Sequence, residues 1–290
     1  MVFHPPVAII AKAGDAGKYK VGIPYWNMLL RGFMAGAYIA IGGALATVCS
    51  TGVSATLGAG MAKLILGSVF PVGLIIIVLT GAELFTGDAM LAPLAALIHK
   101  ISWAEVLNLW VWVYIGNLIG SIFYAYIMAY GPLTGWNAAG AATVNAFGLA
   151  AVNIAIGKVS YVGLAATWSC FLKAIGCNWL VNLAILLGIC ADDLIGKFFG
   201  IWFPIMAFVS TGFEHCVANM YFIPAGIMTS GYLSADQIAT IGADKVASLN
   251  WVTMWTNNII VVTIGNIVGG LVFVGLLYWV AFRKEIAALK

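Results

Sequence analysis

The sequence predicts an all-α membrane protein with six membrane-spanning segments, of which the second and the fifth are interrupted. Composition supports the class, because 63% of the 290 residues are hydrophobic and only 8% are charged. Soluble domains carry about 25% charged residues, so this chain cannot cover a water-facing surface. The mean hydropathy of +1.05 agrees with this assignment. A further observation is that two of the hydrophobic segments contain the same broken pattern.

The hydrophobic segments define the predicted organisation of the chain. A spanning helix needs about 20 mostly apolar residues. Six regions meet this requirement: 28–49, 64–98, 104–131, 161–190, 197–232 and 253–282. We therefore expect an N-terminal segment at 1–27, a six-span transmembrane domain at 28–282 and a C-terminal tail at 283–290. The N-terminal segment lacks the apolar core of a signal peptide, so the first span is expected to target the chain.

The distribution of lysine and arginine predicts the orientation of the chain. Cytoplasmic loops carry an excess of these residues. With the N-terminus inside, the inner loops hold Lys12, Lys18, Lys20, Arg31, Lys100, Lys197, Arg283, Lys284 and Lys290. The outer loops then hold Lys63, Lys158 and Lys245. This imbalance predicts a multi-pass protein of the cell membrane, inner or plasma, with both termini in the cytoplasm.

The two overlong segments share one sequence pattern. Each begins with Phe-Pro, reaches a Gly-x-Glu motif, and resumes as an apolar stretch that contains a proline. The motifs are Gly81-Ala-Glu83 and Gly212-Phe-Glu214. Paired, interrupted segments in corresponding halves of a membrane protein indicate a transport site near the bilayer midplane. Both breaks should therefore face an internal pathway, with half-helices that start near Thr86 and near Asn219.

Ionisable residues inside a membrane segment are costly and suggest function. Glu214 and His215 stand side by side in "GFEHCVANM", and Asn219 follows them. For Glu83 and Glu214 two readings are open: a pore role, or the satisfaction of free backbone N–H groups at the break, which is favoured. For His215 a pore role is favoured over a buried structural histidine, because it is the only histidine deep within a span.

The quoted segments resemble the formate/nitrite transporter family. "LTGAELFTG" is similar to the first signature of that family, and "AIGCNWLVNLA" is similar to the second, with Asn182 in place of the usual cysteine. "GFEHCVANM" is similar to the motif that carries the central histidine. "GMAKLILG", "FMAGAYIAIGG" and "NNIIVVTIGNIVGG" also fit, although Val261 stands where proline is common. The resemblance covers about residues 25–285.

The resemblance implies a fold and a set of pore residues. The expected fold is an aquaporin-like bundle, assembled as a homopentamer with one pore in each chain. The central histidine falls on His215, with Thr86 opposite, and the outer vestibule residues fall on Lys158 and Asn178. The hydrophobic constrictions fall on Phe70, Leu74, Leu84, Phe85 and Phe208. A plain surface lysine remains an alternative for Lys158.

These residues predict a channel or transporter, not an enzyme, for a small monovalent anion. Formate is the first expectation, with nitrite or hydrosulfide as the alternative. Moving a bare carboxylate past apolar collars costs up to about 20 kcal/mol in the idealised case. A neutral acid avoids most of this cost. We therefore expect passage as an anion or a protonated acid, with His215, Thr86, Glu214 and Asn219 at the pore and proton relay.

The sequence also bears on three other classes of membrane protein. A haem-bearing membrane anchor usually needs two axial histidines at membrane depth, and only His215 qualifies. A proton- or sodium-coupled transporter could use Glu83, Glu214 and His215, and the sequence leaves such coupling open. A neutral-solute pore lacks support, because the chain has no repeated Asn-Pro-Ala motif. The five cysteines form no Cys-x-x-Cys pair, so we expect no thiol metal site, and we predict no cofactor and no nucleic-acid partner.

Overall fold

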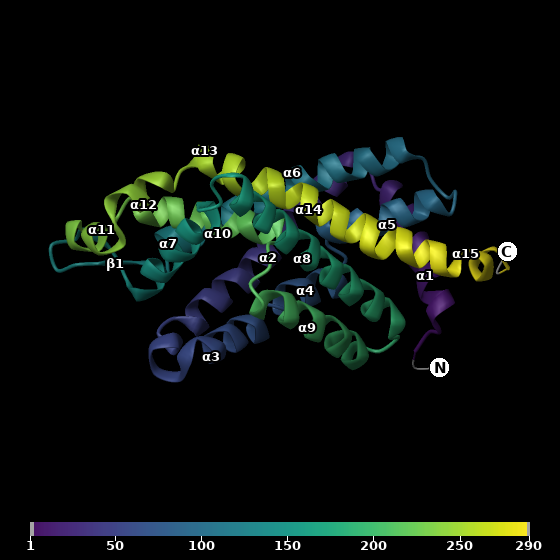
Figure 1. Cartoon of the computed structure of the whole chain (residues 1–290), viewed down its shortest axis with the longest axis horizontal. Helices are drawn as coiled ribbons and strands as arrows, with labels where there is room; N and C mark the ends of the chain where they lie inside the picture. The colour runs from purple at the N-terminus through teal and green to yellow at the C-terminus, as the bar shows by residue number, and fades with distance from the viewer. Residues whose placement is uncertain (1–2, 289–290) are drawn as a thin grey trace.

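A computed structural model describes residues 3–288 of the chain (Figure 1). The first half contains α1 (Pro6–Val21), α2 (Tyr25–Ser50), α3 (Val53–Val69), α4 (Val72–Thr80), α5 (Phe85–Leu97), α6 (Trp103–Tyr130), β1 (Thr134–Trp136) and β2 (Ala142–Val144). The second half contains α7 (Ala146–Val159), α8 (Leu164–Cys190), α9 (Leu194–Ser210), α10 (Cys216–Ser230), α11 (Ala235–Ile241), α12 (Ala243–Ser248), α13 (Trp251–Met254), α14 (Ile260–Gly270) and α15 (Leu277–Ala288).

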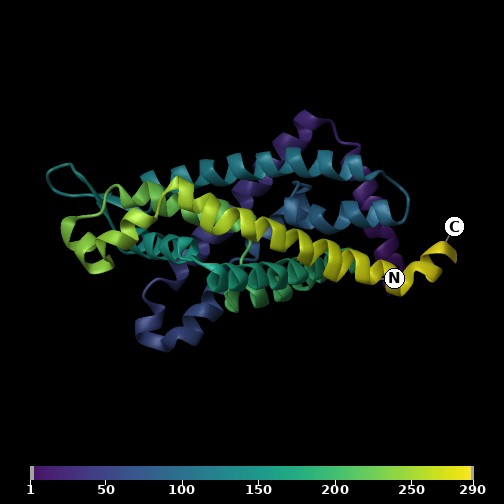
Figure 2. The same ribbon diagram turned by 45° about the horizontal axis from the view of Figure 1, so that its top comes forward.

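The predicted helical membrane fold is confirmed. Five helical segments of the described chain are long and apolar enough to cross a membrane: Tyr25–Ser50, Val53–Thr80, Trp103–Tyr130, Leu164–Cys190 and Trp251–Ala288. The remaining crossing is divided between α9 and α10. The last segment is one continuous rod in which the π-helical turns η1 (Trp255–Ile259) and η2 (Leu271–Leu276) alternate with α-helix. Figure 2 shows this rod and α6 running along the long axis of the molecule.

Spans two and five are interrupted at the Gly-x-Glu motifs. Helix α4 ends at Gly81 and α9 ends just before Gly212, and both glycines have a φ of 77°. Only glycine adopts this left-handed conformation readily, so each motif stops its helix and redirects the chain. After an extended stretch the chain resumes as the half-helices α5 and α10. The second half-helix begins at Cys216, three residues before the predicted start near Asn219.

The connection between α6 and α8 has regular structure of its own. Residues 132–160 contain a short antiparallel hairpin of β1 and β2, and then α7. The Asn145 side chain caps α7 by accepting from the backbone N–H of Gly148 at 3.0 Å. Apolar residues with helical spacing on this helix are buried against α10, which gives the segment its structure.

Helix α1 packs against the half-helix α5. Ile10 and Ala13 lie in one buried cluster with Leu91 and Leu94 of α5. A Cβ atom at Gly17 would lie 2.2 Å from the backbone oxygen of Leu91, so the two helices are in close contact there. The N-terminal segment therefore forms part of the folded domain, and α2 begins at Tyr25, slightly before the predicted start of span one.

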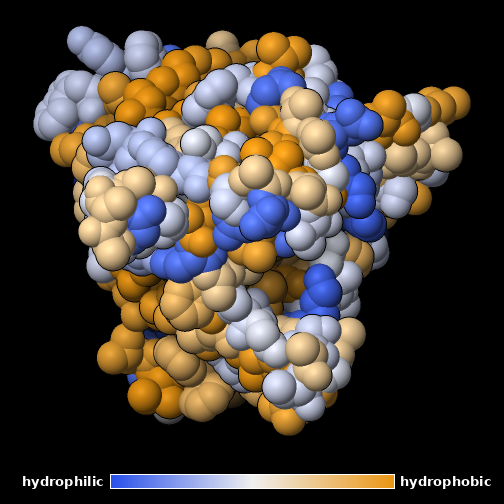
Figure 3. Space-filling view, turned by 90° about the vertical axis from the view of Figure 1, so that its left-hand side faces the viewer, coloured by the Kyte–Doolittle hydropathy of each residue, from blue (hydrophilic) through white to orange (hydrophobic). Residues whose placement is uncertain are grey.

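The two ends of the molecule differ. Both termini lie at the end that carries α1 and α15, whereas α3, α11 and the hairpin lie towards the opposite end (Figure 1). Figure 3 looks onto that opposite end, where hydrophilic residues gather across the middle and hydrophobic residues cover the lower part. We call the end with Lys20 the α1 side and the end with Lys158 the α7 side. A membrane protein is expected to place its polar surface at such ends.

Helices α2 and α6 form the tightest helix pair, and glycines set their separation. A Cβ atom at Gly36 would lie 2.1 Å from the carbonyl oxygen of Asn117, and one at Gly120 would lie 1.9 Å from that of Phe33. Small residues at such positions allow the backbones of membrane helices to approach closely. The close approach fixes α6, which carries Asn117, relative to the first break.

Replacement of Gly120 by alanine should therefore destabilise the fold. The added methyl group has no space, and overpacking costs about 1–3 kcal/mol. The matched control is Gly157→Ala on α7, where a Cβ atom would have no neighbour within 4 Å. Thermal unfolding of both purified variants in detergent measures the effect. A Gly120→Ala variant as stable as Gly157→Ala would contradict the close packing of α2 and α6.

Candidate functional site

The N-terminal ends of the two half-helices meet in the middle of the chain. Thr86, in the first turn of α5, and His215, at the start of α10, are joined by a hydrogen bond of 3.0 Å between Oγ1 and Nε2. Both side chains are buried, with exposed fractions of 0% and 3%. The structure thus brings together two residues that lie in opposite halves of the sequence.

Two asparagines hold the breaks in place. The Asn117 side chain accepts from the N–H of Phe85 at 2.9 Å and donates to the carbonyl oxygens of Gly32 at 2.8 Å and Glu83 at 2.9 Å. One side chain thus satisfies three backbone groups around the first break. A backbone group that is left unpaired at such depth costs several kcal/mol.

Asn266 performs the same task at the second break. Its side chain accepts from the N–H of Cys216 at 2.9 Å and donates to the carbonyl oxygens of Ala174 at 2.8 Å and Glu214 at 2.9 Å. The favoured sequence interpretation, in which the glutamates satisfy the free N–H groups, is therefore wrong for the N–H groups of Phe85 and Cys216. The glutamate side chains are left to make other contacts.

His215 is the N-cap residue of α10. Its Nδ1 accepts a hydrogen bond from the backbone N–H of Ala218 at 3.0 Å. An acceptor nitrogen carries no proton, so the neutral ring has its proton on Nε2 and donates it to Oγ1 of Thr86. Protonation of Nδ1 would break the cap. The local geometry therefore favours a neutral imidazole that presents one N–H donor.

Two cavities lie on either side of this pair. The first has a volume of about 120 Å³ and is lined on the α7 side by Lys63, Lys158 and Asn219, with Phe70, Phe208 and His215 at its floor. The second has a volume of about 310 Å³ and is lined by Leu74 and Leu84 together with charged residues. Those charged residues are Lys20, Arg31, Glu83, Asp88 and Lys197. We call the two cavities the α7 vestibule and the α1 vestibule.

Apolar side chains separate the two vestibules. The rings of Phe70 and Phe208 meet edge to face with 5.9 Å between centroids. The Phe208 ring also stacks on His215 at 5.8 Å. Leu74 and Leu84, which line the other cavity, are 1% and 3% exposed. Phe70 and Phe208 thus close one cavity with apolar side chains, and Leu74 and Leu84 do the same at the other.

Phe85 and Asn178 lie elsewhere than the resemblance implied. The Phe85 ring packs against Tyr114 of α6 with 4.9 Å between centroids, and it lines neither vestibule. Asn178 is fully buried, next to the N-terminal end of α5. Its side chain donates to the carbonyl oxygens of Thr86 at 3.0 Å and Asn266 at 2.6 Å. Asn178 is thus a positioning residue for Thr86, and Phe85 anchors α5 to α6.

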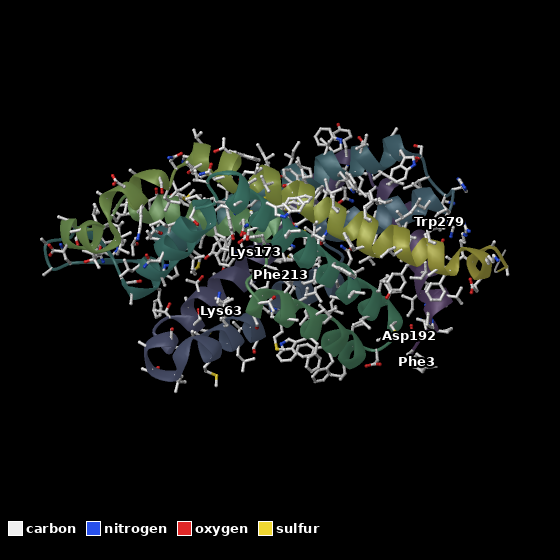
Figure 4. All side chains as sticks on the ribbon, viewed as in Figure 1. Phe3, Lys63, Lys173, Asp192, Phe213 and Trp279 are labelled. Atoms are coloured by element: carbon white, nitrogen blue, oxygen red, sulfur yellow. The ribbon has the colours of Figure 1, made fainter. Side chains whose placement is uncertain are left out.

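Lys158 and Glu214 form an ion pair at the α7 vestibule. Lys158 Nζ lies 2.9 Å from Glu214 Oε1, so this lysine is not a plain surface residue. The same oxygen accepts from the Tyr161 hydroxyl at 2.9 Å, and Lys173 donates to that hydroxyl at 3.1 Å. Figure 4 shows Lys173 and Lys63 near the middle of the molecule, away from Asp192 and the two termini.

Asn219 completes the surroundings of Glu214. Its amide donates to Glu214 Oε2 at 2.6 Å and to Asn258 Oδ1 at 2.8 Å. Asn258 lies in the π-helical turn η1 and also donates to the Lys158 carbonyl oxygen at 2.9 Å. The buried carboxylate is therefore well hydrogen-bonded, as a buried charge must be.

Sequence reasoning missed the two asparagines that organise the breaks. Asn117 and Asn266 lie inside long helices, where a single polar residue carries little information. A signal was nevertheless present, because each asparagine follows a glycine, in "GNLIG" and "GNIVGG", within corresponding halves of the chain. The repeat of a Gly-Asn pair with small residues one turn later distinguishes these positions.

Together, the spans and the two vestibules define a multi-pass membrane protein with two cavities near one buried polar pair. The sequence matches the family model described as formate/nitrite transporter over residues 7–280, and the chain belongs to this family. Members of this family are channels and transporters for small anions, not enzymes.

Individual relatives and a solved structure agree with this assignment. The chain is 46% identical over 292 residues to a probable formate transporter of Methanothermobacter thermautotrophicus, with 98% of each chain covered. It is 37% identical over 290 residues to a formate channel of Bacillus thuringiensis, with 100% of each covered. A pentameric formate channel with formate bound is similar in structure, with a TM-score of 0.75, 35% identity, and 90% of this chain and 98% of that chain covered.

Replacement of Asn117 by alanine should destabilise the first break. The change leaves three buried backbone groups without a partner, and each unsatisfied group costs about 1–3 kcal/mol. The matched control is Asn153→Ala on α7, at an exposed position. Thermal unfolding in detergent should show a clearly lower unfolding temperature for Asn117→Ala and no change for Asn153→Ala. Equal stability of the two variants would mean that water replaces the side chain.

Proposed function

We propose that this chain is a formate channel in which each protomer carries one pore. The observation that supports the proposal most directly is the Thr86–His215 hydrogen bond, which lies between two lysine-bearing vestibules. Lysines attract a small anion, and the apolar collars exclude larger or strongly hydrated solutes. The relatives named above carry formate in their descriptions, which supports formate as the solute.

Passage through the collars favours the neutral acid. Desolvating a bare anion costs several kcal/mol even after relaxation. Formate that has bound a proton is neutral formic acid, which carries no charge into the apolar collars. Lys158, held beside Glu214, concentrates the anion at the α7 vestibule. Phe70, Phe208 and Leu74 then select the uncharged form.

His215 acts in this proposal mainly as a fixed hydrogen-bond donor. Its Nδ1 is engaged by Ala218, and its Nε2 faces Thr86. When a substrate oxygen arrives, Nε2–H can turn from Thr86 to that oxygen without a change of charge on the ring. A proton for the substrate then comes from vestibule water or from a carboxyl group, and Thr86, Glu214 and Asn219 hold the surrounding geometry.

The orientation and the assembly follow from the same proposal. The excess of lysine and arginine at the α1 side supports an orientation with that side, and both termini, in the cytoplasm. Exposed apolar side chains such as Phe199, Phe203 and Trp168 suit lipid or neighbouring protomers. The similar solved channel is pentameric, which supports a homopentamer here.

Nitrite is the second candidate solute. It is also a small monovalent anion with a weak conjugate acid, and the family description includes it. Both anions fit a pathway bounded by Phe70 and Leu74, and the preference for formate rests on the named relatives. Parallel uptake measurements with the two anions decide between them.

The His215→Asn variant tests the histidine. Asparagine is a good N-cap, so α10 should remain capped while the donor towards Thr86 is lost or displaced. Formate uptake into liposomes should fall about fivefold or more, since a lost hydrogen bond in the pathway removes about 1 kcal/mol or more. His99→Asn is the matched control, because His99 is exposed and has a φ of 60° that asparagine tolerates. Unchanged uptake by His215→Asn would assign the histidine a structural role only.

The Lys158→Gln variant tests the attraction of the anion. The apparent KM for formate should rise several-fold from the α7 side, because one nearby unit charge at a protein surface contributes about 1 kcal/mol or more. The effect should weaken at high salt. Lys245→Gln, at an exposed position on α12, is the control with the same loss of charge. Equal KM values for the two variants would remove Lys158 from the uptake site.

A further inference from the structure

The two halves of the chain repeat one local pattern around their breaks. Gly81 and Gly212 have the same left-handed backbone conformation, and Glu83 and Glu214 follow two residues later. Each break is held by one asparagine in the same way, as described above. Three crossings lie in each half, so the second half runs through the membrane in the opposite direction to the first.

Each glutamate is paired with a lysine from the helix that begins its half. Lys20 of α1 pairs with Glu83, and Lys158 of α7 pairs with Glu214. These corresponding pairs align the sequence of the second half with that of the first, with Glu214 opposite Glu83. Positions five residues after each glutamate can then be compared directly.

These positions hold Asp88 in the first half and Asn219 in the second. Asn219 supplies a hydrogen-bond donor to its glutamate, at 2.6 Å from Glu214 Oε2. An ionised aspartate cannot do so, because a carboxylate only accepts. A protonated aspartic acid has one O–H donor and matches the amide of Asn219 in this respect.

The Asp88 carboxyl group is fully buried and poorly satisfied. Its exposed fraction is 0%, and among the described residues its carboxyl oxygens have Lys20 as their one polar side-chain contact. Lys20 Nζ lies 3.0 Å from Oδ1 but is hydrogen-bonded to Glu83. The Trp110 indole reaches only the Asp88 backbone oxygen, at 3.0 Å. An ionised carboxylate that is fully buried with one shared ammonium as its partner is poorly compensated.

The charges around Asp88 come from four elements. They are Lys20 on α1, Arg31 on α2, Glu83 in the break and Lys197 on α9. Arg31 lies 3.8 Å from Glu83 Oε1, and Lys197 donates to the Gly188 carbonyl oxygen at 2.9 Å. Lys20 is thus the one cation of this group in contact with Asp88 among the described residues.

Lys20 remains charged and is shared by both carboxyl groups. Burial lowers the pKa of Lys20, but the nearby Asp88 and Glu83 more than offset this and hold the pKa above its usual range. Arg31 lies 3.8 Å from Glu83 Oε1 and helps to compensate that carboxylate, whereas Asp88 has Lys20 alone as a neighbouring cation among the described residues. Because Asp88 shares this cation with a second carboxyl group, its protonated form is favoured.

We propose that Asp88 holds a proton beside Glu83 and acts as a proton-exchange site for the permeating acid at the α1 vestibule. This inference rests on the proposed function and deepens it. The site faces the cavity beside Leu84 and Leu74, where an anion from the α1 side must become neutral before it crosses the collars.

The exchange step balances with water as the only further reactant. An anion in the α1 vestibule takes the proton, so the O–H bond of the carboxyl pair breaks and an O–H bond forms on the substrate. The pair is left with one additional negative charge, next to Lys20. A proton from water of the vestibule restores the pair. In the opposite direction the neutral acid returns its proton to the pair and leaves as an anion.

Infrared spectroscopy of the purified full-length protein tests the proton on Asp88 without any transport assay. At neutral pH the wild type should show the C=O band of a buried carboxylic acid, and Asp88→Asn should lose it. Asp15→Asn is the matched control, because Asp15 lies on α1 at the same side and pairs with Lys100 at an exposed position. Absence of the band in the wild type, or its persistence in Asp88→Asn, overturns the proposal.

Formate flux in oriented membrane vesicles tests the exchange. The asparagine variant keeps a donor at this position, as in the second half, so folding should be retained. Wild-type flux should rise up to about tenfold per unit fall in pH on the α1 side, as expected when one proton is required. Asp88→Asn should flatten this dependence and leave the response to α7-side pH unchanged, while Asp15→Asn should behave as wild type.

The two failures are distinguishable. If the wild type carries no formate, the proposed function fails, and the infrared band still decides whether the carboxyl pair holds a proton. If formate is carried and the band is lost in Asp88→Asn, but the α1-side pH dependence is unchanged, the exchange role is overturned.

Discussion

The structure depends on one constraint: backbone polar groups at two broken helices must be satisfied where water is excluded. Asn117 and Asn266 meet it with three hydrogen bonds each. Each amide binds the glutamate carbonyl oxygen within the break and the first backbone N–H of the half-helix that follows. The two asparagines therefore also fix the direction in which α5 and α10 begin. The position of Thr86 opposite His215 is a consequence of this restraint.

The capping hydrogen bond at His215 limits the chemistry available to the ring. A histidine that carried a proton on both nitrogens would lose its contact with Ala218 and leave an N–H group at the break without a partner. Proton transfer through this residue therefore competes with the stability of α10. A neutral ring that only donates a hydrogen bond avoids the conflict, which moves the source of the proton towards the vestibules.

Much of the fold follows from the sequence, because hydropathy and Gly-x-Glu motifs are local signals. The six spans and both interruptions were predictable in this way, and His215 could be selected as the only deeply placed histidine. Thr86 could be placed opposite it only through the family resemblance, since nothing local connects the two. Phe85 was misplaced because the direction of a side chain at a helix start depends on its tertiary partners, here Tyr114.

The difference between the two vestibules has a physical meaning. On the α7 side, Glu214 accepts hydrogen bonds from Lys158, Tyr161 and Asn219. On the α1 side, a second carboxyl group takes the place of the amide, and one lysine serves both. A symmetric pair of vestibules would treat an anion alike from either side. Asp88 removes that symmetry, so the neutralisation of the substrate is expected to depend more strongly on pH at the α1 side.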